Sequence, residues 1–274
     1  MKKYKLVVSD LDRTLITRNN KVPDFNIEIV NKIKKKGVKF CVATGRSYDA
    51  IINILKSINT NNSDEEYSII LNGSVIVTNK SKTIIYFNGI NYFLSLKIFE
   101  LGKNYDIMIM FYTIDYCYCY KPINEILKIK KIINEKYIII ENIESLKNEK
   151  IAKIVFCKYD RNYLEKIGNE IFKLFKDEIE ISFSSEKYLE INIKGANKGS
   201  SLKFLSNYLK INISEVIAIG DNDNDLPMIE NAGLGICVAN ANDNVKKKSD
   251  YICQNNNENG GVKEALEKFI LSNE

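Results

Sequence analysis

Two aspartates near the start of the chain, Asp10 and Asp12, are the first residues whose types and spacing suggest chemistry. They follow an apolar run, residues 4–8, which predicts a short buried strand. A carboxylate at the end of such a strand is poorly solvated unless another group compensates its charge, so both side chains can face a ligand-binding cavity. The alternative is a simple turn, in which Asp12 starts a loop and Thr14 forms a local hydrogen bond.

A second acidic cluster follows another apolar run, residues 216–220, and contains Asp221, Asp223 and Asp225. Carboxylates gathered this closely repel one another unless a cation neutralises them. A shell made only of oxygen ligands favours a hard cation such as Mg²⁺. A calcium-binding loop is the competing explanation. The segment lacks that loop's glycine at the sixth position and its glutamate at the twelfth, and no helix is predicted before it.

Hydrogen-bond donors occur at other predicted strand and helix ends. Thr44 offers a hydroxyl after the predicted strand 38–43, and Gly45 allows a ligand to approach the backbone closely. Free N–H groups at the start of the following helix can bind an anion. Plain helix capping with a surface Arg46 explains the same residues without any ligand. Together with Lys198, these groups are the donors that a phosphoryl group needs.

The pattern of elements explains why these residues would meet. Residues 4–8, 26–36 and 38–43 have the patterns of a strand, a helix and a strand, which predicts a right-handed βαβ unit with parallel strands. Ligands bind at the carboxyl ends of the strands in open sheets of this kind. The sequence therefore predicts one shared site at that edge of the sheet.

The middle of the chain has a different pattern. From about residue 84 to 190, helical segments alternate with aromatic-rich strands and no strand is followed by acidic residues. We therefore predict an α/β protein with a Rossmann-like parallel-sheet core formed by residues 1–83 and 191–274, and an inserted α/β domain at 84–190 with a mostly antiparallel sheet. Cys117 and Cys119 suggest a metal pair, but an alternating strand is the favoured explanation.

The amino-acid composition restricts the chemistry. The chain has 274 residues and no histidine, which excludes catalytic triads that need histidine and most catalytic zinc sites. The six cysteines have no framework spacing, so we expect a reducing, cytoplasmic location. No apolar run approaches the roughly 18 residues of a membrane span, and the first residues do not resemble a signal peptide.

The charge is mildly positive, with 40 Lys and Arg against 35 Asp and Glu. No basic block is interleaved with aromatic residues, so we do not expect nucleic acid as a partner. An anionic small substrate is compatible with this charge, and the sequence indicates no obligate protein partner.

The ordered motifs resemble those of the haloacid dehalogenase-like hydrolase superfamily, and in particular the Cof-type phosphatases with an α/β cap of the C2B type. The resemblance extends over essentially the whole chain and rests on four motifs: Asp10-Leu11-Asp12-Arg13-Thr14-Leu15, Thr44-Gly45-Arg46, Asn197-Lys198-Gly199, and Gly220-Asp221-Asn222-Asp223-Asn224-Asp225. It implies a Mg²⁺-dependent phosphatase that hydrolyses a small phosphomonoester, such as a sugar phosphate, through an aspartyl-phosphate. The inserted domain would be the cap, which would close over the site and select the leaving group.

The resemblance also implies roles for the first group of residues. Asp10 would be the nucleophile and a Mg²⁺ ligand. Asp12 would be the general acid and then the general base, with its backbone carbonyl on the metal. Asp221 would bind the metal directly. Thr44 and Lys198 would complete the catalytic set by contacting the phosphoryl oxygens.

Further residues would have supporting roles in the same scheme. Thr14, Gly45 and Arg46 would contribute to substrate binding. Asn224 would reach the phosphate or the residues around it, and Asp225 would support Lys198 or a metal-bound water.

Arg13 departs from the family pattern, which usually has glycine at this position. We expect it to adopt an ordinary backbone conformation or to be tolerated at some cost. We expect its side chain to point away from the site, and a role beside the phosphate is the alternative. Two other functions stay open at this point. One is a phosphomutase or phosphotransferase, although Arg161 is the single arginine of residues 84–190. The other is a non-catalytic protein that binds a phosphometabolite, which Arg13 alone supports.

Overall fold

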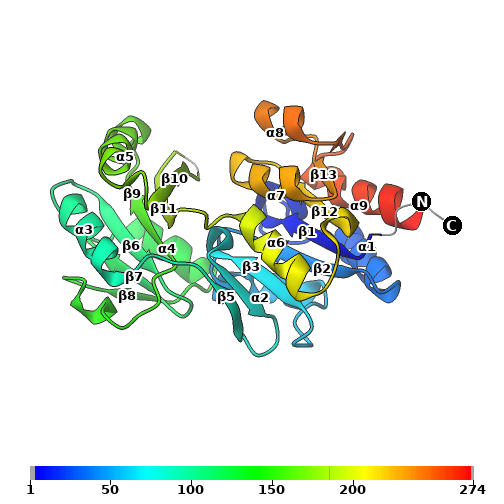
Figure 1. The fold of residues 1–274 in the computed structure, drawn as a ribbon, viewed down its shortest axis with the longest axis horizontal. Helices are drawn as coiled ribbons and strands as arrows, with labels where there is room; N and C mark the ends of the chain where they lie inside the picture. Colours follow the sequence, from blue (N-terminus) through cyan, green and yellow to red (C-terminus); the bar gives the residue numbers. More distant parts are fainter. Residues whose placement is uncertain (1–3, 185, 273–274) are drawn as a thin grey trace. The chain divides into compact units, whose positions relative to one another are not determined.

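The computed structural model describes residues 4–184 and 186–272. By their contacts the residues divide into two compact units (Figure 1). The first contains the residues up to Gly45, Ile52–Tyr86 and the residues from Asn197 onward, and the second contains Arg46–Ile51 and Phe87–Ala196. The functional division at residues 84 and 190 stays a prediction.

The first unit is built on an eight-stranded sheet in which β1 lies near the middle. The strand order is β14-β13-β12-β1-β2-β3-β4-β5. The pairs from β14 to β3 are parallel, whereas β3 and β4 are antiparallel. The bounds are β1 (Leu6–Asp10), β2 (Lys39–Ala43), β3 (Tyr67–Ile70), β4 (Val75–Thr78), β5 (Ile84–Phe87), β12 (Val216–Gly220), β13 (Leu234–Cys237) and β14 (Tyr251–Ile252).

Helices flank this sheet, as expected for buried parallel strands. Leu202 and Leu205 of α6 and Met228 of α7 pack with Leu6 and Val8 of β1 in one hydrophobic core. The helix α1 packs against β2 and against α9. The bounds are α1 (Asp24–Lys35), α2 (Tyr48–Ser57), α6 (Lys198–Tyr208), α7 (Leu226–Asn231), α8 (Asp243–Lys248) and α9 (Gly261–Leu266).

The second unit contains a six-stranded sheet with the order β10-β11-β9-β6-β7-β8. Its neighbouring strands are antiparallel apart from the parallel pair β7 and β8. This sheet and the parallel sheet of the first unit confirm the predicted α/β class. The bounds are β6 (Met108–Tyr112), β7 (Cys117–Tyr120), β8 (Tyr137–Ile139), β9 (Lys153–Cys157), β10 (Ile179–Phe183) and β11 (Tyr188–Ile193).

Helices cover both faces of this second sheet. Side chains alternate between the faces of a strand, so Ile109 and Phe111 of β6 join a core with α3 (Tyr92–Gly102) and α5 (Arg161–Phe175). Met108 and Met110 face α4 (Asn124–Ile132) together with Cys117 and Cys119. The two thiols are therefore core residues of a strand, with their sulfur atoms 3.8 Å apart, as the alternation predicted.

Within residues 4–184 and 186–272, no helix combines the length and the apolar character that a membrane span requires.

Candidate active site

Asp10, the last residue of β1, is the central residue of the candidate site. All residues of β1 are buried, and Asp10 itself is 6% exposed. The chain turns directly afterwards, through Leu11–Leu15. The Ser9 hydroxyl donates to the backbone carbonyl of Asp10 at 2.8 Å. A strand buried on both faces thus brings one carboxylate to its carboxyl end.

Lys198, the first residue of α6, supplies the positive charge beside it. Its side chain is 1% exposed, and its Nζ donates to Oδ1 of Asp10 at 2.5 Å and to Oδ1 of Asp225 at 2.6 Å. The start of the helix is fixed by a capping box, in which Asn197 and Ser200 satisfy one another's backbone N–H groups. Local capping therefore positions the lysine between two carboxylates from distant segments.

Asp225 is fully buried and organises the turn after β12. Its Oδ2 accepts hydrogen bonds from the backbone N–H groups of Asp221, at 3.0 Å, and Asn222, at 3.1 Å. Gly220 makes this arrangement possible, because a Cβ atom there would lie 2.5 Å from the Cβ of Asp225. Both oxygens of Asp225 are thus engaged by protein donors.

Asp221 completes a cluster with an unsatisfied oxygen. One carboxylate oxygen from each of Asp10, Asp221 and Asp225 lies within 4.8 Å of the others. Oδ1 of Asp221 accepts a hydrogen bond from the Thr14 hydroxyl at 3.1 Å, whereas its buried Oδ2 has no hydrogen-bond partner within residues 4–184 and 186–272. A buried oxygen without a donor suits a cation ligand. The donor set, which is all oxygen, fits Mg²⁺, with Asp10 and Asp221 as the available carboxylates.

The pKa shifts of Asp10, Asp221 and Lys198 indicate that this site favours a further positive charge. Burial, followed by the neighbouring Asp225, raises the pKa of Asp10 well above its usual range, although Lys198 opposes this shift. The same two causes raise the pKa of Asp221 to about 7, against the opposing effect of Arg13. Burial would lower the pKa of Lys198, but the carboxylates of Asp10 and Asp225 raise it above its ordinary value. Lys198 supplies one positive charge beside three clustered carboxylates, which leaves excess negative charge at this site.

Arg13 differs from the expectation. Its backbone adopts a left-handed conformation, with φ of 60°, so the substitution is tolerated and the backbone is not ordinary. The prediction that its side chain points away is wrong, because its Nε lies 3.6 Å from Oδ2 of Asp221. Its Nη2 also donates to the backbone carbonyl of Asn240 at 3.4 Å. The unpaired carboxylate oxygen attracts the guanidinium.

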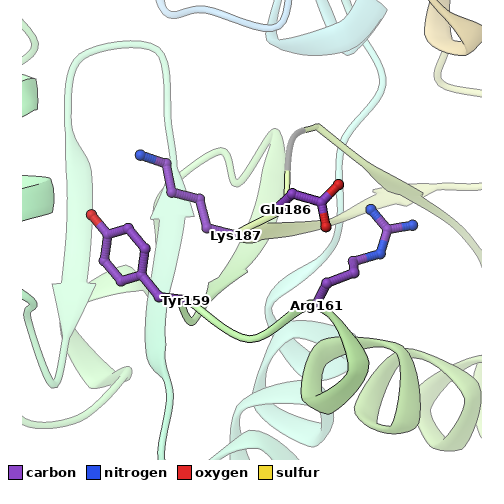
Figure 2. Close-up of a pocket in the computed structure, with 4 residues that line it drawn as sticks. All are labelled: Tyr159, Arg161, Glu186 and Lys187. Atoms are coloured by element: carbon purple, nitrogen blue, oxygen red, sulfur yellow. The ribbon is translucent and has the colours of Figure 1, made fainter.

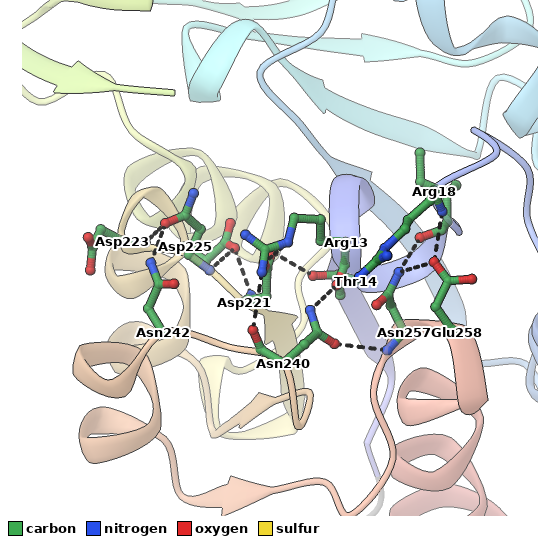
Figure 3. A network of polar contacts seen from close by, with 12 residues as sticks. Arg13, Thr14, Arg18, Asp221, Asp223, Asp225, Asn240, Asn242, Asn257 and Glu258 are labelled. Carbon is green, nitrogen blue, oxygen red and sulfur yellow. Dashed lines mark hydrogen bonds and ion pairs between the residues drawn. The ribbon is translucent and has the colours of Figure 1, made fainter. Parts of the chain in front are cut away.

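The C-terminal part of the chain holds the loop that carries Arg13 (Figure 3). The side-chain amide of Asn240 donates to the Arg13 carbonyl at 2.8 Å, and its oxygen accepts from the backbone N–H of Asn257. Asn257 in turn donates to the Ile16 carbonyl, and Glu258 accepts from the backbone N–H of Arg18 at 2.8 Å. This network fixes both ends of the loop after β1.

Thr44 and Gly45 follow β2 in the same unit. Thr44 is fully buried, and its backbone forms hydrogen bonds with Ile69 and Asn72, at the end of β3. A Cβ atom on residue 45 would lie 2.7 Å from Oδ1 of Asn72. A side chain at position 45 would therefore displace the Asn72 side chain from its present place.

For the remaining predicted site residues, the structure gives the burial and the element or unit to which each belongs. Asp12 is exposed, and Thr14 is buried against Asp221. Asn224 lies on the turn Asp223–Asp225 with a partly exposed side chain. Arg46 belongs by its contacts to the second unit. The roles assigned to these residues stay predictions.

Two asparagines that shape the site were not among the predicted site residues. Asn72, at the end of β3, has φ of 58° and contacts the position of Gly45. Asn240 bonds the loop at Arg13. The Asn72-Gly73 dipeptide at a strand end was a readable turn signal. The pairing of Asn240 with Arg13 spans 227 positions, and no local pattern reveals such a partner.

A parallel sheet with a carboxylate cluster and a buried lysine at its carboxyl end defines an α/β enzyme that can bind a cation beside an anionic group. Residues 7–266 match the family model of the haloacid dehalogenase-like hydrolases, and the chain belongs to this family. The predicted family and the prediction of a hydrolase are thereby confirmed.

Individual relatives agree with this assignment. The chain is 27% identical to a Haemophilus influenzae protein named "Putative phosphatase", over 97% of this chain and 98% of that protein. It is 38% identical to a phosphoglycolate phosphatase from Methanobrevibacter smithii, over 47% of this chain and 55% of that protein. A crystal structure of a haloacid dehalogenase-like hydrolase from Bacteroides thetaiotaomicron aligns with a TM-score of 0.88 at 27% identity, covering 98% of this chain and 100% of that one.

The raised pKa of Asp221 predicts how the stability of metal-free protein depends on pH. The folded protein keeps this proton up to about pH 7, whereas an unfolded chain releases it near pH 4. Asp221 therefore lowers the free energy of unfolding as the pH rises through this interval. We expect Asp221→Asn to be more stable than wild type by about 1–3 kcal/mol at pH 7 and to lose that advantage towards pH 4.

Denaturant titrations in EDTA across this pH range measure the difference. Equal pH profiles for the two proteins would contradict the assignment of a buried, proton-retaining carboxyl to Asp221.

Proposed function

We propose that this protein is a Mg²⁺-dependent phosphatase that hydrolyses a small phosphomonoester through an aspartyl-phosphate on Asp10. The observation that carries the proposal is the buried Asp10 carboxylate, held by Nζ of Lys198 at 2.5 Å and lying in one cluster with Asp221. A carboxylate is a competent nucleophile towards phosphorus. The lysine and a bound cation would allow an anionic phosphate to approach it.

The proposed reaction has two displacements at phosphorus. An oxygen of Asp10 attacks, the bond from phosphorus to the leaving oxygen breaks, and Asp12 donates its proton to that oxygen. Asp12 then accepts a proton from a water, whose oxygen attacks the phosphorus and releases inorganic phosphate and the Asp10 carboxylate. The exposure of Asp12 supports a role in exchanging protons with substrate and water.

The surrounding groups manage the negative charge. Lys198 would balance charge on Asp10 and on the phosphoryl oxygens, and Thr44 would donate its hydroxyl to them. Asp10, Asp221 and the backbone carbonyl of Asp12 would hold Mg²⁺, which neutralises charge on the transferring phosphoryl group. Thr14 orients Asp221 through its 3.1 Å hydrogen bond.

The proposed substrate is a small phosphorylated metabolite. The name of the Methanobrevibacter smithii relative, phosphoglycolate phosphatase, supports this class. Thr14, Gly45, Arg46 and Asn224 are proposed to bind the substrate, and the segment 84–190 is proposed to act as the cap. The six cysteines are free and buried, which supports action in a reducing compartment such as the cytoplasm.

The phosphomutase alternative gains no support from the second unit. The Nε of Arg161 forms a 2.8 Å ion pair with Glu165, and its guanidinium lies 3.7 Å from the ring centre of Phe183. Arg161 lines a surface pocket of about 440 Å³ with Tyr159, Glu186 and Lys187 (Figure 2). This pocket is poorly suited to a second phosphate, because Glu186 is acidic and Arg161 is already paired with Glu165.

Replacing the nucleophile tests the proposed function. We expect Asp10→Asn to lower phosphate release from a panel of phosphomonoesters by at least about 10³-fold, because an amide does not attack phosphorus. Wild type should need Mg²⁺ and lose activity in EDTA. Asp24→Asn, an exposed aspartate of α1, is the matched control and should keep full activity. Substantial activity in Asp10→Asn would refute the proposal.

Replacing Asp12 separates the two displacements. With p-nitrophenyl phosphate, the leaving group needs no proton, so Asp12→Asn should release a stoichiometric burst of nitrophenolate. Steady-state turnover should fall by about 10²–10⁴-fold, because water activation lacks its base. With an alkyl phosphate the burst should vanish. Rapid-mixing absorbance and phosphate assays measure both phases, and unchanged steady-state turnover would exclude Asp12 as the general base.

A further inference from the structure

Arg13 occupies an unusual position for a positively charged residue. It lies in the turn directly after β1 with φ of 60°, where a side chain is strained. Its side chain is 61% exposed, yet its Nε lies 3.6 Å from Oδ2 of Asp221, whose side chain is 3% exposed. An exposed arginine therefore reaches inward to a buried carboxylate.

Apart from this ion pair with Arg13, Oδ2 of Asp221 has no hydrogen-bond partner among the residues that the structure describes. Lys198 forms its ion pairs with Asp10 and Asp225, and the Thr14 hydroxyl donates a hydrogen bond to Oδ1 of Asp221. Oδ2 of Asp221 has no hydrogen bond, and 3.6 Å is an ion-pair distance that is too long for a hydrogen bond. The guanidinium of Arg13 therefore offsets the negative charge of Asp221 without donating a hydrogen bond to Oδ2.

The contacts with Asn240 keep Arg13 near this position. Asn240 donates to the Arg13 carbonyl at 2.8 Å and accepts at its own carbonyl from Nη2 at 3.4 Å. Figure 3 shows the guanidinium between Asp221 and Asn240. The strained backbone and the side chain are thus held by one residue of the C-terminal segment, which argues that the inward orientation is built into the fold.

We propose that Arg13 is an internal counter-ion of Asp221 that competes with the divalent cation and thereby sets the cation affinity of the site. The inference rests on the proposed function, since it assigns the cation to Asp221. In the metal-free protein the guanidinium stabilises the carboxylate. When a cation binds at Oδ2, the two positive groups repel one another, and the exposed side chain is free to swing towards solvent.

The direction of the effect follows from the contacts. The Thr14 hydroxyl already orients the Asp221 carboxylate, and the Asp225 carboxylate holds the backbone N–H of Asp221. Removing Arg13 therefore relieves the repulsion of the cation and leaves both of these contacts in place. A partly exposed unit charge near a divalent cation gives a modest effect in a screened environment, and we expect roughly three- to tenfold in affinity. The effect should shrink in high salt.

Mg²⁺ titration by calorimetry tests this inference on the full chain. Arg13→Gln should bind Mg²⁺ roughly three- to tenfold more tightly than wild type, whereas Arg13→Lys, which keeps the charge, should stay near wild type. Arg18→Gln is the matched control, because Arg18 is exposed on the same loop and its backbone N–H bonds Glu258. It should also bind like wild type.

The melting temperature, measured with and without Mg²⁺, is a second test. If Arg13 only stabilised the fold, its replacement would lower the melting temperature equally in both conditions. Arg13→Gln should melt below wild type in EDTA and equal to it in saturating Mg²⁺, because the cation replaces the lost counter-ion. Equal or weaker Mg²⁺ binding by Arg13→Gln, or a melting difference that persists in Mg²⁺, would overturn the inference. If wild type itself binds no Mg²⁺, the proposed function fails together with this inference.

Discussion

The buried ammonium of Lys198, hydrogen-bonded to Asp10 and Asp225, is the interaction on which the rest of the site depends. Burying carboxylates is costly unless cations and donors compensate them. One lysine satisfies two of the three clustered aspartates, and the backbone N–H groups of the turn satisfy Asp225 further. Asp221 keeps one oxygen without a donor. The resulting shortage of positive charge is what makes the site suited to a cation.

Holding this cluster requires segments that are far apart in the sequence. The parallel pairing of β1 with β12 and β2 brings Asp10 to the same sheet edge as the turn after Gly220 and as Thr44. Capping by Asn197 then places Lys198 between the carboxylates. The C-terminal segment contributes Asn240, which bonds the loop after β1. The fold thus brings Lys198 and the clustered aspartates together, and Gly220 at the end of β12 leaves room for the side chain of Asp225.

The sequence was informative wherever local pattern determines structure. Apolar runs followed by polar residues located Asp10, Thr44 and Asp221 at strand ends, because a buried parallel strand leaves its functional side chains at its carboxyl end. The direction of the Arg13 side chain was not predictable in this way. It depends on the unpaired oxygen of Asp221 and on the distant Asn240, and neither contact has a signature near residue 13. The shape of the strand ends at Gly45 depends similarly on Asn72, which a different strand supplies.

The measurement that tests the central claim most directly is the location of the phosphoryl group during turnover. Asp12→Asn, mixed with p-nitrophenyl phosphate and Mg²⁺ and quenched in acid, should accumulate the covalent intermediate, because its hydrolysis needs the missing base. Peptide mass spectrometry should then find one added phosphoryl group, labile to hydroxylamine, on Asp10. A phosphoryl group on any other residue, or phosphate release at the wild-type rate with no covalent intermediate in rapidly quenched samples, would contradict the account.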